Sequence, residues 1–232
     1  MSDKHTFLLI HGGMCCGRWW RNVADILEAQ GHRVFAPTLT GLGERAHLMS
    51  RDINLTTHAQ DVATLIKWEE LSDVVLVGHS YGGMVISAAA ELVPEGGIRS
   101  IVYLDAMYLD DSECVFDAAP EFRDAVGDAD AIPSPAPAFF GYDGEIAAFM
   151  ERTESPQPVG TFSEKLKLTG ARERIPLKTF VWARNSGIPA FREYYDRLET
   201  DPSWRTEIMD TRHNMMLEAP KETAEVLLRA AR

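Results

Sequence analysis

A serine flanked by two glycines is the strongest chemical signal in this sequence. Residues 78–82 read Gly-His-Ser-Tyr-Gly, which places Ser80 in the pattern Gly-x-Ser-x-Gly. Such a serine occupies a sharp turn from a strand into a helix, and the glycines leave room for the backbone of that turn. The short pattern also arises by chance, but here an apolar run (74–77) precedes it and a run of small residues (83–90) follows it. This context predicts that Ser80 is a nucleophile.

A histidine late in the chain is the candidate general base. A serine nucleophile of this kind takes its base from a loop that follows the last strand of the sheet. Of the seven histidines, His213 alone lies between a predicted strand (206–209) and a C-terminal helix. We therefore predict that His213 accepts the proton of Ser80, and we interpret His79, inside the serine motif, as a packed structural residue.

Two backbone N–H groups are the candidate oxyanion hole. Negative charge develops on the carbonyl oxygen during attack by a serine, and it requires hydrogen-bond donors. One donor in such sites is the residue after the nucleophile, here Tyr81. The other comes from the loop after the first strand, where small residues allow a close approach of the backbone. We assign this second donor to Gly13, and a plain tight turn is the alternative for that loop.

The elements that must position these residues follow an α/β pattern. Short apolar runs alternate with amphipathic segments, which is typical of a parallel sheet flanked by helices. Strands are predicted over 7–10, 33–36, 74–77, 101–104, 179–183 and 206–209. Helices are predicted over 19–30, 58–69, 83–92, 189–199 and 221–231, with Thr57 and Gln60 as a capping box for the second.

The alternation stops between residues 107 and 174. This segment holds a proline-rich run (132–137), a short apolar helix near 145–150 and no clear strand. It is too long for an ordinary loop of a compact domain. We predict a cap inserted into a core made of residues 1–106 and 175–232. A disordered linker is the alternative, but the aromatic residues Phe139, Phe140, Tyr142 and Phe149 disfavour it.

Several segments together resemble a known enzyme family. They are residues 9–13 (Leu-Ile-His-Gly-Gly), Trp19 with Trp20, residues 37–45, and the segments around Ser80 and His213. The chain resembles bacterial esterases related to the plant methylesterase and hydroxynitrile lyase branch of the α/β-hydrolases. This resemblance implies the α/β-hydrolase fold and ester cleavage through an acyl-enzyme, without a cofactor.

The acidic member of the triad departs from the pattern of the plant enzymes. Their aspartate precedes a Gly-Ile-Pro-like turn, and the matching residue here is Asn185. An asparagine cannot stabilise an imidazolium as a carboxylate does. Asp105 follows the neighbouring strand, so we predict that Asp105 is the acid. Asp196 and Asp210 are poorer candidates. The alternative is that Asp105 caps a turn and the site works without an acid.

Other activities on the same scaffold remain to be separated from ester hydrolysis. Hydroxynitrile lyases of this branch carry a threonine and a lysine where this chain has Gly12 and Asn214, so the lyase alternative is disfavoured. Cleavage of a carbon–carbon bond, cofactor-free oxygenation and a non-catalytic small-molecule receptor remain alternatives.

Residues near the predicted triad are candidate pocket walls, although any of them could instead belong to the core. They are Met14, Cys15, Met107, Tyr108, Phe139, Phe140, Trp182 and Met215. Such walls favour an apolar or aromatic ester of moderate size.

Composition limits the partners and the compartment. The formal net charge of −12 disfavours nucleic acid and anionic membranes as partners. No apolar stretch reaches the ~18 residues of a spanning helix, and no metal-ligand spacing such as His-Glu-x-x-His occurs. Three cysteines without a disulfide pattern and a start without a signal peptide predict a cytoplasmic protein. A homodimer is compatible with the sequence, which leaves the oligomeric state open.

Overall fold

Six parallel strands form the centre of the structure, a computed structural model that describes residues 4–126 and 129–232. The strand order is β2-β1-β3-β4-β7-β8. The strands are β1 (Thr6–Ile10), β2 (Arg33–Phe35), β3 (Val74–Ser80), β4 (Ile98–Ala106), β7 (Leu177–Ala183) and β8 (Arg205–Met209). All six predicted strands are confirmed, and β4 extends further than predicted at both ends.

The central strands are buried on both faces of the sheet. Leu8 and Leu76 belong to one apolar cluster, whereas Phe7 and Val75 belong to the other. Successive side chains of a strand point to opposite faces, so a continuous apolar run supplies both clusters. This explains why β1 and β3 are apolar without alternation.

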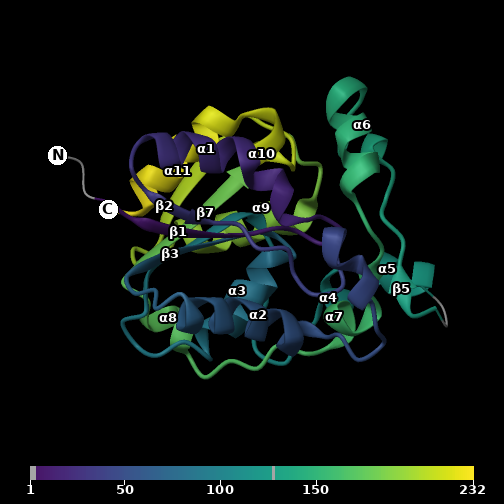
Figure 1. Cartoon of the computed structure of the whole chain (residues 1–232), viewed down its shortest axis with the longest axis horizontal. Coiled ribbons are helices and arrows are strands. Elements are labelled where there is room, and N and C mark those ends of the chain that lie inside the picture. Colours follow the sequence, from purple (N-terminus) through teal and green to yellow (C-terminus); the bar gives the residue numbers. More distant parts are fainter. Residues whose placement is uncertain (1–3, 127–128) are drawn as a thin grey trace.

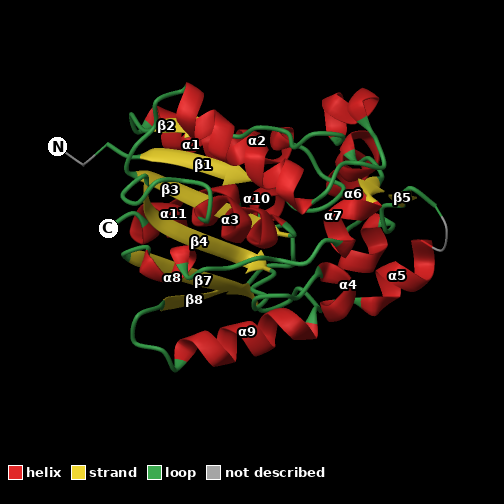
Figure 2. Cartoon of the chain, turned by 90° about the horizontal axis from the view of Figure 1, so that it is seen from below, coloured by secondary structure: helices red, strands yellow, loops and turns green. Residues whose placement is uncertain are grey.

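Helices cover both faces of the sheet (Figures 1 and 2). The helices α1 (Arg21–Ala29) and α11 (Pro220–Ala230) lie on one face, and α2 (Leu55–Trp68) and α3 (Gly82–Ala90) lie on the other. The helix α9 (Pro189–Glu199) packs Phe191, Tyr195 and Leu198 into the apolar cluster that α2 and α3 share. A short 3₁₀ helix, η1 (Gly17–Trp20), precedes α1.

The second predicted helix begins three residues earlier than expected. Asn54 caps α2, because its Oδ1 accepts the Thr57 N–H at 2.9 Å and the Thr57 hydroxyl receives the Asn54 N–H in return. The capping box predicted for Thr57 and Gln60 is therefore wrong. Asparagine caps as well as threonine, and its position just before the apolar repeat decides between them.

The segment 107–174 adds no strand to the main sheet. Its elements are α4 (Val115–Ala118), α5 (Pro120–Val126), β5 (Ala131–Ile132), η3 (Pro137–Phe140), α6 (Gly144–Thr153), β6 (Gln157–Pro158), α7 (Val159–Ser163) and α8 (Ala171–Arg174). The two short strands pair with each other in antiparallel fashion. Figures 1 and 2 show α5, α6 and β5 grouped at one end of the sheet. Among the described helices, none is long and apolar enough to cross a bilayer.

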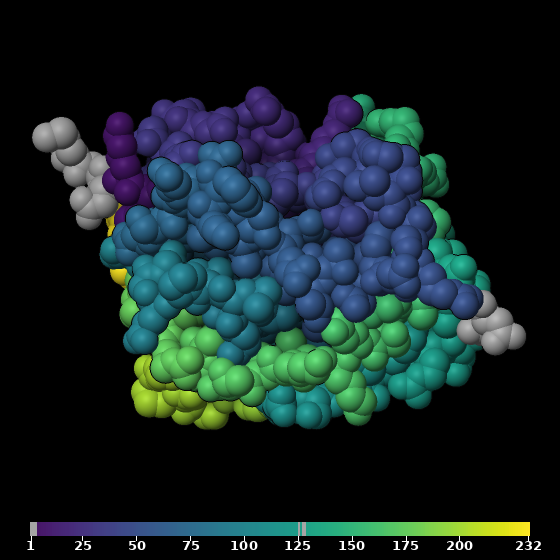
Figure 3. Space-filling model, turned by 60° about the horizontal axis from the view of Figure 1, so that its bottom comes forward, coloured from purple at the N-terminus to yellow at the C-terminus, as the bar shows by residue number. Residues whose placement is uncertain are grey.

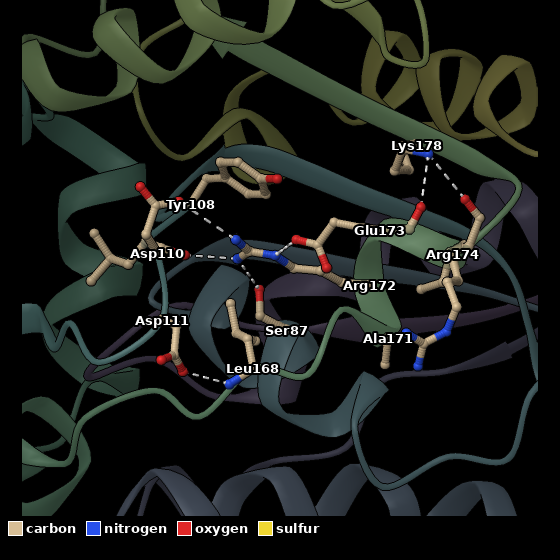
Figure 4. A network of polar contacts seen from close by, with 12 residues as sticks. Ser87, Tyr108, Asp110, Asp111, Leu168, Ala171, Arg172, Glu173, Arg174 and Lys178 are labelled. Carbon is tan, nitrogen blue, oxygen red and sulfur yellow. Dashed lines mark hydrogen bonds and ion pairs between the residues drawn. The ribbon is translucent and has the colours of Figure 1, made fainter.

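The last part of this segment returns to the core through a buried arginine (Figure 4). Arg172 donates to the Leu109 carbonyl at 2.8 Å and pairs with Glu173 at 2.7 Å. Its guanidinium lies over the Tyr108 ring, 4.1 Å from the centroid. Eight residues earlier, Glu164 accepts two hydrogen bonds from Thr56 at the start of α2, and Figure 3 shows green residues of this segment beside the blue residues of α2. The last part of the segment is thus tied to α2 through Glu164, and to its own first residues, just after β4, through Arg172.

Two buried histidines make the fold sensitive to acid. Burial lowers the pKa of His11 and of His58 to about 4, because the charged ring would lose its hydration. In the unfolded chain both rings titrate near 6.5, so the unfolded state binds more protons below that pH. We expect the free energy of unfolding to fall between about pH 6.5 and 4, by about 3 kcal/mol for each histidine. Urea unfolding at several pH values measures this, and a constant free energy across that range would contradict it.

Candidate functional site

Ser80 ends β3 in a strained turn. Its φ is 53°, a left-handed value that is uncommon for a residue with a side chain. A Cβ on Gly78 would lie 2.5 Å from the Gly82 carbonyl oxygen, and one on Gly82 would lie 2.8 Å from the Ile10 oxygen. Glycine is therefore required at both positions, because β1, β3 and α3 approach too closely for a side chain. The turn places Ser80 at the carboxyl end of β3, where it lines a cavity.

His213 and Asp105 meet at the same end of the sheet, where the parallel strands have their carboxyl ends. His213 lies on the loop after β8, and Asp105 lies at the end of β4 with a φ of 42°. The His213 Nδ1 lies 2.7 Å from the Asp105 Oδ2, and both side chains are buried. The strand between them, β7, supplies the Ala183 N–H to the Asp105 Oδ1 at 3.0 Å. The carboxylate therefore fixes the imidazole so that its Nε2 is left for another partner.

Burial has opposite consequences for the two groups. It lowers the pKa of His213, because an imidazolium without water is costly, and the resting ring is therefore neutral. Burial raises the pKa of Asp105, whereas hydrogen bonds from the Ala183 N–H and the Ser186 side chain lower it. A neutral histidine beside a carboxylate is ready to accept a proton.

Asn185 does not take part in this contact. Its side chain is exposed, and its backbone N–H donates to the Thr211 carbonyl at 3.0 Å. The Asn185 position therefore holds the loop after β7 against the loop after β8. The carboxylate that contacts His213 belongs instead to Asp105 on β4, the strand next to β7 on the side away from β8.

The two predicted oxyanion donors have no acceptor among the described residues. Gly13 and Tyr81 line the cavity that contains Ser80 and His213. Within residues 4–126 and 129–232, neither backbone N–H makes a hydrogen bond. Backbone N–H groups at such depth are normally paired, so two of them beside one serine are available to a ligand oxygen.

The histidine inside the serine motif, His79, packs against His213 and bonds to its backbone. The His79 Nε2 lies 3.0 Å from the His213 carbonyl oxygen, and because that oxygen can only accept, Nε2 carries the proton. The two rings lie 4.5 Å apart between centroids. This agrees with the interpretation of His79 as a packed structural residue.

Four of the eight expected pocket residues line the catalytic cavity. They are Met14, Cys15, Met107 and Phe140. Phe140 also stacks on the His213 ring at 5.2 Å between centroids. The cavity measures about 60 Å³, which is small beside the ~300 Å³ at the lower end of ligand pockets.

The other four lie outside this cavity. Tyr108 packs under Arg172 and against Trp204, and Trp182 packs against Tyr195 and Arg192. Phe139 is 67% exposed, and Met215 is fully buried in the apolar cluster beneath α1 and α11. Their positions in the sequence, next to the strand ends or in the cap, did not show which way each side chain points.

Several cavity residues have no signal in the sequence. Trp19, Phe122, Ser134, Pro135, Glu154 and Phe162 line the cavity as well. All but Trp19 come from the segment 107–174, where no periodic pattern singles them out. Within the described part of the chain, no group of three His, Cys, Asp or Glu side chains could hold a metal ion.

The oxyanion loop is held by this same segment. Met14 has a φ of 61°, its N–H donates to the Gln157 Oε1 at 2.7 Å, and its carbonyl accepts the Ser155 N–H at 2.9 Å. Gln157 is fully buried, and its Nε2 donates to the Thr161 hydroxyl at 2.7 Å. Both polar groups of the Met14 backbone are thus held from β6 and the residues before it, and this orients the peptide next to Gly13.

A Gln157 variant should affect turnover more than substrate binding. In Gln157→Met the Met14 N–H loses its acceptor, so we expect a misplaced Gly13 N–H and a kcat about tenfold lower, since a complete loss of one oxyanion donor costs about 10²–10³. The KM should change little. Steady-state kinetics measure both, and a raised KM with an unchanged kcat would instead assign Gln157 to substrate binding.

Comparison with known proteins identifies the family of the chain. The model of a family described as "Alpha/beta hydrolase family" matches residues 7–226. The chain is 34% identical over 237 residues to the carbendazim hydrolyzing esterase of Nocardioides sp. (strain SG-4G), covering 96% of this chain and 98% of the relative. It is 38% identical over 113 residues to methylesterase 1 of Arabidopsis thaliana, which covers 47% of this chain and 42% of the relative.

A solved structure matches over the whole length. It is an extracellular α/β-hydrolase from a Paenibacillus species, described as sharing structural and functional homology with tobacco salicylic acid binding protein 2. Its TM-score is 0.84 at 28% sequence identity, and the match covers 98% of this chain and 99% of that chain.

Proposed function

Because this chain belongs to the α/β-hydrolase family, we propose that it hydrolyses carboxylic esters of small molecules through Ser80, His213 and Asp105. The match to the family model confirms the fold class predicted from the sequence. Relatives named as esterases support an esterase-type hydrolase. The observation that carries the proposal is one cavity lined by Ser80, His213, Gly13 and Tyr81, in which the last two have backbone N–H groups with no acceptor among the described residues.

The first half of the reaction forms an acyl-enzyme. His213 takes the proton of Ser80 as the serine oxygen attacks the ester carbonyl carbon, and Asp105 stabilises the resulting imidazolium. The N–H groups of Gly13 and Tyr81 hold the oxygen that becomes negative. The imidazolium then gives its proton to the departing alcohol.

The second half releases the acid. A water molecule loses its proton to His213 and attacks the acyl carbon, and the same two N–H groups hold the oxyanion. When the bond to Ser80 breaks, the serine recovers its proton from His213. The site returns to its starting state, and the protein's own residues supply each proton transfer.

The test separates this proposal from its alternatives. A fluorophosphonate should label Ser80, whereas a non-catalytic receptor should resist labelling. An activated ester should give a burst of alcohol followed by slower turnover, as expected for an acyl-enzyme. Labelling without ester turnover would favour another reaction on the same scaffold, such as carbon–carbon bond cleavage.

The pH dependence follows from the neutral state of His213. Burial lowers the pKa of His213 below the ordinary value of about 6.5, so the base remains available at lower pH than a free imidazole would be. We expect kcat/KM to rise with pH to a plateau that begins below about pH 6.5. Short initial-rate assays at fixed ionic strength measure this, and a midpoint clearly above 6.5 would contradict it.

The segment 107–174 is proposed to act as a cap that shapes the pocket. Phe140 lines the cavity and stacks on His213, whereas its neighbour Phe139 is exposed. We expect Phe140→Ala to shift the relative rates along a series of esters of increasing size by about tenfold, the lower end of the effect of one methylene group in an apolar pocket. Phe139→Ala is the matched control and should leave the relative rates unchanged. Equal effects of the two variants would rule out a specific role for Phe140.

The small volume of the cavity also limits the size of the substrates. A volume of about 60 Å³ suits short acyl or alcohol groups better than the moderate-sized esters suggested by the aromatic content of the sequence. We therefore propose that the enzyme acts on short esters, and a rate comparison across acyl lengths tests this.

A further inference from the structure

One carboxylate lines the catalytic cavity without a positively charged partner in the described part of the chain. Glu154 follows α6 and lines the same cavity as Ser80 and His213. Its side chain is half-buried. Among the described residues its one hydrogen bond comes from the Ser134 hydroxyl, at 2.7 Å to Oε2, and it forms no ion pair.

This isolation is unusual for the acidic residues of this protein. Asp105 has His213, and most of the other buried or half-buried carboxylates described accept several hydrogen bonds or pair with an arginine. Burial raises the pKa of Glu154, which shows that its surroundings penalise the negative charge. A carboxylate in a cavity, with one of its oxygens accepting no hydrogen bond, is stabilised by a ligand that brings a positive charge or an N–H group.

The Ser134 hydroxyl completes a polar patch on one wall. Ser134 also lines the cavity, and with its proton given to Glu154 its oxygen can accept a second hydrogen bond. The oxyanion loop is adjacent, since the N–H of Ser155, the residue after Glu154, donates to the Met14 carbonyl at 2.9 Å. The remaining wall contains Phe122, Phe140 and Phe162. Besides the catalytic groups and this patch, the polar side chains of the lining are those of His79, Asn214 and the Cys15 thiol.

We propose that Glu154 and Ser134 form a recognition subsite for a positively charged nitrogen bearing an N–H group on the ester substrate. The inference rests on the proposed ester hydrolysis and names its substrate class: short esters of amino alcohols or of amino acids with a basic nitrogen. The N–H donates to the free oxygen of Glu154, and the charge replaces the missing counter-ion. A substrate with a carboxylate of its own is disfavoured at the same wall.

Matched ester pairs test this on the unmodified protein. Dimethylaminoethyl acetate and isopentyl acetate have the same shape, but the first carries an N–H⁺ where the second has a C–H. Methyl dimethylaminopropanoate and methyl methylpentanoate form the corresponding pair for the acyl side. We expect kcat/KM to favour the amine in at least one pair by about tenfold, which corresponds to about 1.4 kcal/mol. A preference for the hydrocarbon in both pairs would overturn the inference.

Variants then assign the preference to this carboxylate. Glu154→Gln should reduce the amine-to-hydrocarbon ratio about tenfold, since it removes the charge and keeps the shape. Glu145→Gln is the control, because it removes an exposed charge from the far end of α6 and should leave the ratio unchanged. An unchanged ratio in Glu154→Gln, or an equal loss in both variants, would overturn the subsite. Ester hydrolysis itself fails only if Ser80 is dispensable, so the two proposals are distinguishable.

Discussion

Ser80→Ala should lower kcat for ester hydrolysis by about 10⁶, the size of the loss seen when a serine-protease nucleophile is removed. The variant loses the oxygen that forms the acyl-enzyme, while the elbow still accommodates a small side chain at the strained φ of 53°. The remaining rate should come from the Gly13 and Tyr81 N–H groups and from binding. Hydrolysis of an activated ester with a highly purified variant measures this.

Two controls make the result specific. The variant should unfold at the same urea concentration as the parent and should lose fluorophosphonate labelling. A variant that folds and still turns over within tenfold of the parent would disprove Ser80 as the nucleophile.

Asp105→Asn should lower kcat by two to four orders of magnitude. The equivalent change in the serine-protease template lowers kcat by about 10⁴, because an asparagine favours the wrong tautomer and does not balance the imidazolium. Here the Asp105 Oδ2 lies 2.7 Å from the His213 Nδ1, so the change acts directly on the base. The Ala183 N–H can still donate to the amide oxygen, which keeps the loop in place.

Asn185 provides the matched comparison. Asn185→Ala removes an exposed side chain and should change kcat less than about threefold, within the range of ordinary surface substitutions. The pair Asp105→Asn with Asn185→Asp moves the carboxylate to the position of the plant enzymes, and a partial recovery would show that both strand ends reach the same nitrogen. If Asp105→Asn were nearly fully active and Asn185→Ala inactive, the acid would have been assigned to the wrong strand.

Local sequence determined the sheet and the nucleophile turn. The apolar runs of β1 and β3 supply side chains to both faces of a buried strand. On the surface of the protein, one of these two apolar faces would be exposed to water. At Ser80 the two glycines are required by backbone contacts of 2.5 and 2.8 Å, so the motif carries its own three-dimensional constraint. The order of Ser80, Asp105 and His213 along the chain placed each of them at a strand end, and parallel strands bring those ends to one edge.

The tertiary structure alone decided which side chains enter the cavity. Tyr108 follows β4 like Met107, yet it turns to Arg172, because a buried guanidinium is stabilised by the face of an aromatic ring. Phe139 and Phe140 are adjacent, yet one is exposed and the other stacks on His213. Gln157 and Glu154 belong to an irregular segment, where no periodicity relates a residue to a face. Gln157 contacts Met14, 143 residues away, and Glu154 contacts Ser134, 20 residues away, and only the tertiary packing brings these partners together.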